Sequence, residues 1–186
     1  MDQFSYLSVL LSIILGLAIT QILKGLRGLV LARVRVRMYW LPVTWAVLVL
    51  IVAVQSWWAM FGLRHVENWT FLGFSFVLLQ NVLLYLVAAL VLPDFFGEAV
   101  DLRAHYFGHH RLFFGLFLLT ALASLAKDLV LSGHLTAPVN LAFHGGFLII
   151  AASAMLTARE TWHRLLPFLT GLLFLAYIAV LFARLP

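Results

Sequence analysis

The stretch TFLGFSFVLLQNVLLYLVAALVL, residues 70–92, contains no charged side chain. A helix needs roughly 20 mostly apolar residues to cross the hydrocarbon core of a bilayer. This stretch therefore predicts a transmembrane helix. Five further runs are also mostly apolar. Together they predict six spans, at about residues 4–23, 40–63, 70–92, 112–131, 137–158 and 165–183.

The composition agrees with a membrane protein. The chain is 65% hydrophobic and 10% charged, whereas a soluble domain carries roughly 25% charged residues. Strands of a membrane β-barrel alternate over about ten positions, and these runs are longer and continuously apolar. We therefore expect an all-α integral membrane protein, a bundle of six transmembrane helices. The connecting segments are too short for a soluble domain, so residues 1–186 form one polytopic domain.

Several classes of function are excluded by what the chain lacks. Cysteine is absent, which excludes disulfides, thiolate nucleophiles and cysteine-ligated metals. No Walker loop, GxSxG, HExxH or selectivity-filter sequence occurs, so no motif indicates an enzyme. The net charge is +5, but the basic residues gather at span ends, where they set orientation. We therefore expect these basic residues to contact lipid and not nucleic acid.

The basic residues also predict the topology. Nine follow the first, third and fifth spans, while Arg64 and Arg184 follow the others. Positive loops face the cytoplasm, so both termini should lie outside. Size and composition are typical of a small bacterial inner-membrane protein, which places the termini in the periplasm. The residues expected at the cytoplasmic headgroups after the first span are Lys24, Arg27, Arg33, Arg35 and Arg37.

These basic residues have three interpretations. They could bind anionic lipid of the inner leaflet, at about 1 kcal/mol each. They could pair with Asp94, Glu98 and Asp101 on the same side, or simply set the orientation. The sequence favours the last.

Two halves of three spans would have opposite orientations, as in a 3+3 inverted repeat. Leu41-Pro42-Val43 and Ala137-Pro138-Val139 open equivalent spans, and residues 69–93 match residues 162–186 in length, in the starting Trp and in the final Leu-Pro. Two leucine-rich segments can also share this much by chance, so both explanations stay open.

Small and hydroxyl side chains form a stripe in the first span. Their spacing of three or four residues places them on one helix face. Such a face lets membrane helices approach closely, within the subunit or between subunits. It could also line a pore between copies of the chain, since hydroxyls bind water and hydrated ions. The stripe comprises Ser5, Ser8, Ser12, Gly16 and Thr20.

Polar side chains within the other spans gather at one depth, from the bilayer centre to its outer half. Intramembrane ionisable groups are costly and point to functional sites. The group could be a polar network that locks the bundle, or a binding site or ion pathway in which His144 titrates, with a reference pKa of about 6.5. Its members are Gln55, Gln80, Asn81, Lys127, Asp128, Asn140 and His144.

A second polar stripe lies between the third and fourth spans and comprises Asp94, Glu98, Asp101, His105 and His109. On a helix these residues fall within about 80°, which predicts an amphipathic helix at the inner membrane surface. The stripe is either the solvated face of that helix or a site for a divalent metal such as zinc, iron or manganese.

His105-x-x-x-His109-His110 resembles one histidine box of the membrane desaturases and hydroxylases, and this resemblance implies metal binding. The chain has seven histidines and no second box, so the resemblance implies nothing more. His163, close to Glu160, could add a ligand if the loops after the third and fifth spans meet.

These patterns favour a small channel or transporter for an ion or small solute, working as a homo-oligomer. The alternative is a non-catalytic integral subunit of a larger complex, associated with lipid or pigment and with other membrane subunits. A membrane metalloenzyme that uses the loop histidines is the third reading. The sequence itself requires no cofactor.

Overall fold

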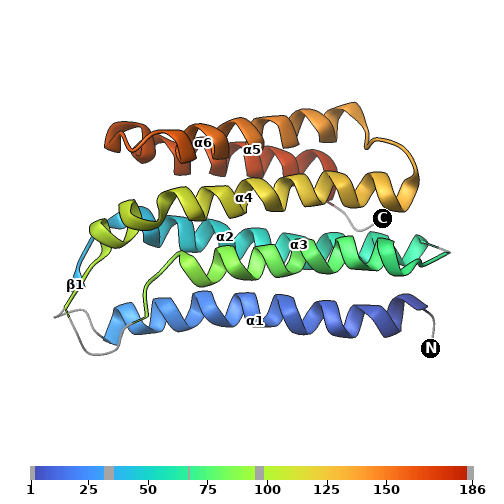
Figure 1. Cartoon of the computed structure of the whole chain (residues 1–186), viewed down its shortest axis with the longest axis horizontal. Helices are drawn as coiled ribbons and strands as arrows, with labels where there is room; N and C mark the ends of the chain where they lie inside the picture. The colour runs from blue at the N-terminus through green and yellow to red at the C-terminus, as the bar shows by residue number, and fades with distance from the viewer. Residues whose placement is uncertain (1–2, 32–35, 67, 95–98, 184–186) are drawn as a thin grey trace.

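The computed structural model of the chain describes residues 3–31, 36–66, 68–94 and 99–183. Six helices run the length of the molecule, and each is long and apolar enough to cross a membrane (Figure 1). Short 3-10 and π segments, Met60–His65 and Ile178–Phe182, continue the second and the sixth. The helices are α1 Gln3–Leu31, α2 Trp40–Ala59, α3 Phe71–Leu90, α4 Leu102–Ser132, α5 Pro138–Leu156 and α6 Glu160–Tyr177.

Local signals fix several helix ends. The hydroxyl of Thr70 accepts the backbone N–H of Gly73 at 3.0 Å and caps α3. The carboxylate of Asp101 accepts two backbone N–H groups at the start of α4. Such caps satisfy amides that have no partner within the helix. Gly133, in the left-handed region with a φ of 71°, ends α4, and Pro138 opens α5, where its missing N–H costs nothing.

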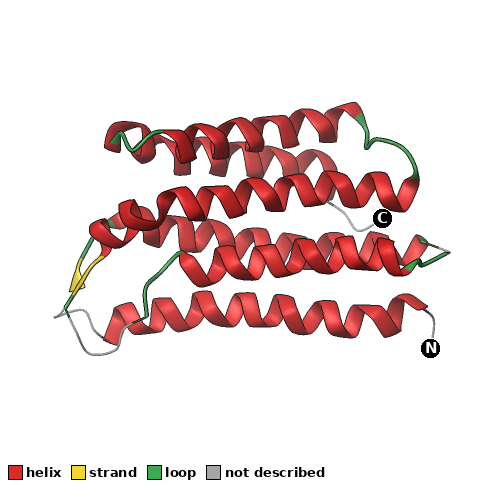
Figure 2. Ribbon diagram, viewed as in Figure 1, coloured by secondary structure: helices red, strands yellow, loops and turns green. Residues whose placement is uncertain are grey.

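The two ends of the bundle differ. The start of α1, the end of α6 and the α2–α3 and α4–α5 turns lie at one end, which we call the terminal end (Figure 1). At the other end, β1 (Val36–Arg37) and β2 (Val100–Asp101) form a short parallel ladder, drawn yellow in Figure 2. The ladder ties the segment that precedes α2 to the one that precedes α4, and we call this the ladder end.

The ladder corrects one prediction. Val100 and Asp101 are strand residues, and α4 then continues from Leu102 to Ser132 without a break. The separate amphipathic helix expected around residues 94–109 is therefore not confirmed, and residues 95–98 lie outside the described part of the chain. The reason is the capping role of Asp101, which starts α4 there and sends His105 and His109 directly into the fourth span.

Helices α2 to α6 surround the middle of the bundle, and α1 packs outside them against α3 and α2. The buried face of α1 is formed by residues such as Leu11, Leu15 and Ala18. Many large apolar side chains point outward, including Phe71 and Ile149, which are 87% and 72% exposed. A surface of this kind is suited to lipid, because apolar side chains avoid water.

The inverted repeat is not confirmed. In the first half α1 packs along α3, whereas the backbones of the corresponding α4 and α6 are not closely packed. In the second half the close pair is instead α4 and α5.

Candidate binding cavity

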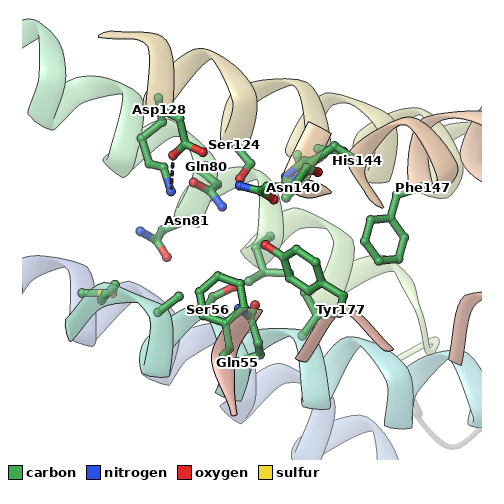
Figure 3. A pocket seen from close by; sticks show the side chains of 18 of the residues that line it. Gln55, Ser56, Gln80, Asn81, Ser124, Asp128, Asn140, His144, Phe147 and Tyr177 are labelled. Atoms are coloured by element: carbon green, nitrogen blue, oxygen red, sulfur yellow. Dashed lines mark hydrogen bonds and ion pairs between the residues drawn. The ribbon is translucent and has the colours of Figure 1, made fainter. Parts of the chain in front are cut away.

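A cavity of about 270 Å³ lies between α2, α3, α4, α5 and α6 (Figure 3). Its lining brings together all seven residues of the polar group expected from the sequence: Gln55, Gln80, Asn81, Lys127, Asp128, Asn140 and His144. In Figure 3, Gln80, Ser124 and Asn140 lie on one side of the space, and Gln55, Ser56 and Tyr177 lie opposite. Residues from five helices therefore meet at one place.

The lining also includes hydroxyl groups that the sequence did not single out: Ser56, Thr120, Ser124, Thr170 and Tyr177. Isolated hydroxyls in a membrane helix give little signal, because they can bond to their own backbone, as Thr120 does with the carbonyl of Leu116 at 2.8 Å. The helical spacing of Thr170 and Tyr177, which share one face of α6, was the signal available.

The cavity occupies the terminal half of the bundle. Gly62 and Leu63 line it just beyond α2, and Lys127 and Asp128 line it near the end of α4. Asn140 contributes from the first turn of α5.

The charged residues of the cavity form an ion pair. The Lys127 ammonium and the Asp128 carboxylate are 3.3 Å apart, and their side chains are 19% and 27% exposed. Neighbouring helix residues point about 100° apart, so the pairing depends on the long Lys127 stem folding back. The two charges cancel within the cavity.

Three side chains of the lining each donate one N–H group to a hydrogen bond within the protein. Nδ2 of Asn81 donates to the Val77 carbonyl at 2.9 Å, and Nδ2 of Asn140 donates to Oγ1 of Thr136 at 2.6 Å. Nδ1 of His144 lies 3.0 Å from the Asn140 carbonyl; since a carbonyl only accepts, Nδ1 carries the proton. Each asparagine amide keeps a second N–H group and its carbonyl oxygen, and Nε2 of His144 keeps a lone pair.

Two polar atoms of the lining, Oδ1 of Asn140 and Oγ1 of Thr170, are buried without a hydrogen-bond partner in the described chain. An unsatisfied buried polar group costs about 1–3 kcal/mol. Neighbouring protein atoms cover both of them, so they are unsatisfied groups within the wall and not contact points for a solute in this conformation.

Aromatic rings fill the bundle on the ladder side of the cavity, where Phe117 of the lining packs against Trp45 with ring centroids 6.2 Å apart. Trp45 and Phe114 are fully buried, with ring centroids 5.1 Å apart in an edge-to-face arrangement. Phe113 packs on both of them. We call Trp45, Phe113 and Phe114 the aromatic layer. Because these rings fill the bundle at this level, the cavity does not continue through it.

The stripe of α1 lies away from the cavity. Ser5, Ser12, Gly16 and Thr20 are exposed and Ser8 is half-buried. A Cβ added to Gly16 would meet no atom within 4 Å. The stripe is therefore not a packing face within this subunit; contact with another subunit, or a pore between subunits, stays a prediction.

The acidic and histidine stripe does not converge. Asp94 pairs with Lys24 at 3.5 Å, and Asp101 caps α4 and pairs with Arg37 at 3.3 Å. His105 and His109 are close, with ring centroids 4.7 Å apart. In the ranges that the structure describes, no three His, Asp or Glu side chains are placed to hold a metal; Glu98 lies outside those ranges.

The pairing of basic with acidic residues at the ladder end is confirmed at two positions, Lys24 with Asp94 and Arg37 with Asp101. Backbone N–H groups, first that of Ala104, hold the pKa of Asp101 below its ordinary value. Arg27 is exposed. Arg33 and Arg35 lie outside the described residues.

The loops after the third and fifth spans do meet, but through a different set of bonds. Glu160 accepts from Arg103 at 2.6 Å and from Arg164 at 2.7 Å. The Tyr39 hydroxyl donates to the same carboxylate at 3.1 Å, and burial raises the pKa of Tyr39. His163, fully buried, accepts from the Tyr106 hydroxyl at 2.8 Å. These bonds join the starts of α2, α4 and α6.

No protein-family model, curated protein or solved structure matches this chain.

Proposed function

We propose that the chain is a small transporter or channel of the bacterial inner membrane, homo-oligomeric, that binds an ion or small solute in the cavity. The observation that carries this proposal is the cavity itself. Protein interiors normally leave few voids larger than a water molecule, and this bundle leaves about 270 Å³ lined by polar groups of five helices.

The competing explanation is a polar network that locks the bundle. A structural network stabilises only if its members satisfy one another. Here Asn140 and Thr170 keep buried atoms without partners in the described chain, and open space separates the walls. Binding of a solute explains the open space, whereas a locking role explains neither feature.

The aromatic layer suggests how transport would be gated. Alternating access requires a state in which the site is open toward one end of the bundle and sealed toward the other, and the aromatic layer would form the seal toward the ladder end. Transport would then require the rings of Trp45, Phe113 and Phe114 to separate while the terminal end closes.

Flux into proteoliposomes tests the proposal. We expect uptake of at least one ion, proton or small uncharged solute well above protein-free vesicles. His144→Gln should change that rate by about tenfold or more, because the cavity loses an imidazole. His109→Gln is the matched control, since His109 is exposed and far from the cavity lining; its flux should equal that of the wild type. Absence of flux for every probe would refute the proposal.

A second candidate, an integral subunit of a larger complex, is favoured by the exposed stripe of α1. Small residues on an outward face are what a second membrane helix packs against. Native mass spectrometry of protein extracted gently from its own membrane separates the two. Copies of this chain alone favour the transporter, and stoichiometric foreign subunits favour the accessory role.

A further inference from the structure

The hydrogen-bonding state of the cavity wall defines the class of solute that would fit there. Asn81, Asn140 and His144 come from α3 and α5, and each has an N–H group bound within the protein. Each asparagine amide keeps a second N–H group and its carbonyl oxygen, of which Oδ1 of Asn140 is buried. Nε2 of His144 keeps a lone pair, because Nδ1 carries the proton. Asn81 and His144 are each only 5% exposed, so their orientation is fixed by packing. This wall therefore accepts a hydrogen bond at Nε2 of His144, which needs a donor from a solute, and has both donor and acceptor groups at the asparagine amides.

The opposite groups are less restricted. Gln55, Gln80 and Tyr177 line the same space and make no side-chain hydrogen bond to the rest of the described chain. An amide and a phenol can each donate. A solute with both a donor group and a carbonyl or hydroxyl oxygen can therefore be satisfied from both sides at once.

The charge of the cavity selects against ions. Lys127 and Asp128 are the charged residues of its lining, and they neutralise each other at 3.3 Å. A monovalent ion that entered would lose water without meeting an unpaired opposite charge, and burial of an uncompensated charge is far more costly than burial of a hydrogen-bonded polar group. An uncharged solute avoids that cost.

The size and the aromatic part of the lining restrict the solute further. Phe147, Phe174 and Tyr177 form one packed cluster, with ring centroids 5.8–5.9 Å apart. Their edges offer an apolar surface beside the polar wall, in a space of about 270 Å³, near the lower limit of small-molecule sites.

From these features we infer that the cavity takes a small uncharged solute bearing N–H or O–H donors, of the carboxamide class. As a statement about transport this rests on the proposed function; as a statement about binding it does not. Three probes of nearly the same shape separate the charge classes: acetamide is neutral, acetamidinium is a cation and acetate is an anion.

Binding is read from the His144 imidazole. In protein labelled with ¹⁵N-histidine, the His144 signals are identified by their loss in His144→Gln. We expect acetamide to shift the Nε2 signal of His144 saturably, because its N–H₂ group donates to that nitrogen, and to leave the exposed His109 signal unchanged. At matched pH, acetamidinium and acetate should produce no saturable shift. A saturable shift with either ion and none with acetamide, or none with any probe, would overturn the inference.

Transport is read in proteoliposomes with the same probes. Wild-type protein should speed acetamide entry at least tenfold over protein-free vesicles and leave the two ions at the protein-free rate. Asn140→Asp keeps an acceptor and adds a negative charge, so it should reverse the order and favour acetamidinium over acetamide at least tenfold. Asn81→Asp applies the same test from α3 if the first variant does not fold.

The two readouts distinguish the two proposals. A His144 shift with acetamide but no flux would refute transport and keep the assignment of the solute. Flux of an ion without flux or binding of acetamide would keep transport and overturn the assignment.

Discussion

Replacing Tyr106 by phenylalanine removes one buried hydroxyl at the ladder end and little else. Nε2 of His163 lies 2.7 Å from the Thr157 carbonyl, so this nitrogen carries the proton and donates. Nδ1 is then an acceptor, and its donor is the Tyr106 hydroxyl at 2.8 Å. His163 is fully buried, so no bulk water can take the place of that hydroxyl.

Tyr106→Phe should therefore lower the free energy of unfolding by about 1–3 kcal/mol, the cost of a buried acceptor without a partner. The assay is reversible unfolding in mixed micelles. Tyr6→Phe is the matched control, because Tyr6 is 72% exposed, and it should change stability by less than about 0.5 kcal/mol.

A double-mutant cycle assigns the loss to the bond itself. With His163→Leu as the second change, the two substitutions should couple by about 1 kcal/mol or more, because they share one hydrogen bond. Equal stabilities of Tyr106→Phe and Tyr6→Phe, or a coupling energy near zero, would refute this reasoning.

Three further predictions concern packing and charge. Gly16→Ala should stabilise α1 by about 0.5–1 kcal/mol through helix propensity, since a Cβ there meets nothing within 4 Å. Gly25→Ala places a Cβ 2.9 Å from the Cβ of Leu92 and should destabilise the protein by about 1–3 kcal/mol. Unfolding curves measure both changes. Lys127→Met leaves the Asp128 carboxylate unpaired and should lower the free energy of unfolding by about 1–3 kcal/mol at pH 8, less than breaking a fully buried pair would. Adding Asp128→Asn should restore stability. Asp101→Ala removes the cap of α4 and should destabilise the protein at pH 7. Because the folded pKa of Asp101 lies below its ordinary 3.8, the loss of stability should be full above pH 3.8 and shrink as the pH falls through the folded pKa. Unfolding measured at pH 7 and pH 3 would show this.

The existence of six helices was readable from hydropathy, but their ends were not. Hydropathy marks the part of a helix that lies in hydrocarbon, and α1 and α4 continue beyond it into charged sequence. Helix α1 extends to Leu31 through Lys24 and Arg27, and α4 begins at Leu102. Hydrogen bonding continues there because neither segment contains a proline.

The gathering of these polar residues at one level was predictable because depth in a bilayer follows from position along a span. Residues such as Gln55, Asn81 and Asn140 are costly to expose to lipid at that depth, so helices that carry them turn those faces inward. The same reasoning does not apply to the stripe of α1, because serine, threonine and glycine tolerate lipid as well as packing. Their burial therefore depended on which neighbours α1 has.

The ladder-end contacts had no local signal. The pairing of Val36–Arg37 with Val100–Asp101 joins segments 64 residues apart, and the bond of Tyr106 to His163 joins segments 57 residues apart. Spacing along one helix cannot show partners on another. The metal prediction for Asp101, His105 and His109 had the same weakness, because it assumed a helix where the chain forms a strand and a cap.

The proposed function requires a solute-accessible cavity in the terminal half of the bundle, with the aromatic layer closing the bundle on its ladder side. The chain has no cysteine, so single cysteines can report it without background. Ser124→Cys lies in the cavity lining, and Ala46→Cys lies one residue from Trp45 and is fully buried. Both should be treated, in vesicles, with the small uncharged reagent 2-hydroxyethyl methanethiosulfonate. We expect rapid modification of the Ser124→Cys protein and none of the folded Ala46→Cys protein. An unreactive cysteine at position 124, or equal reaction at both positions, would contradict the cavity.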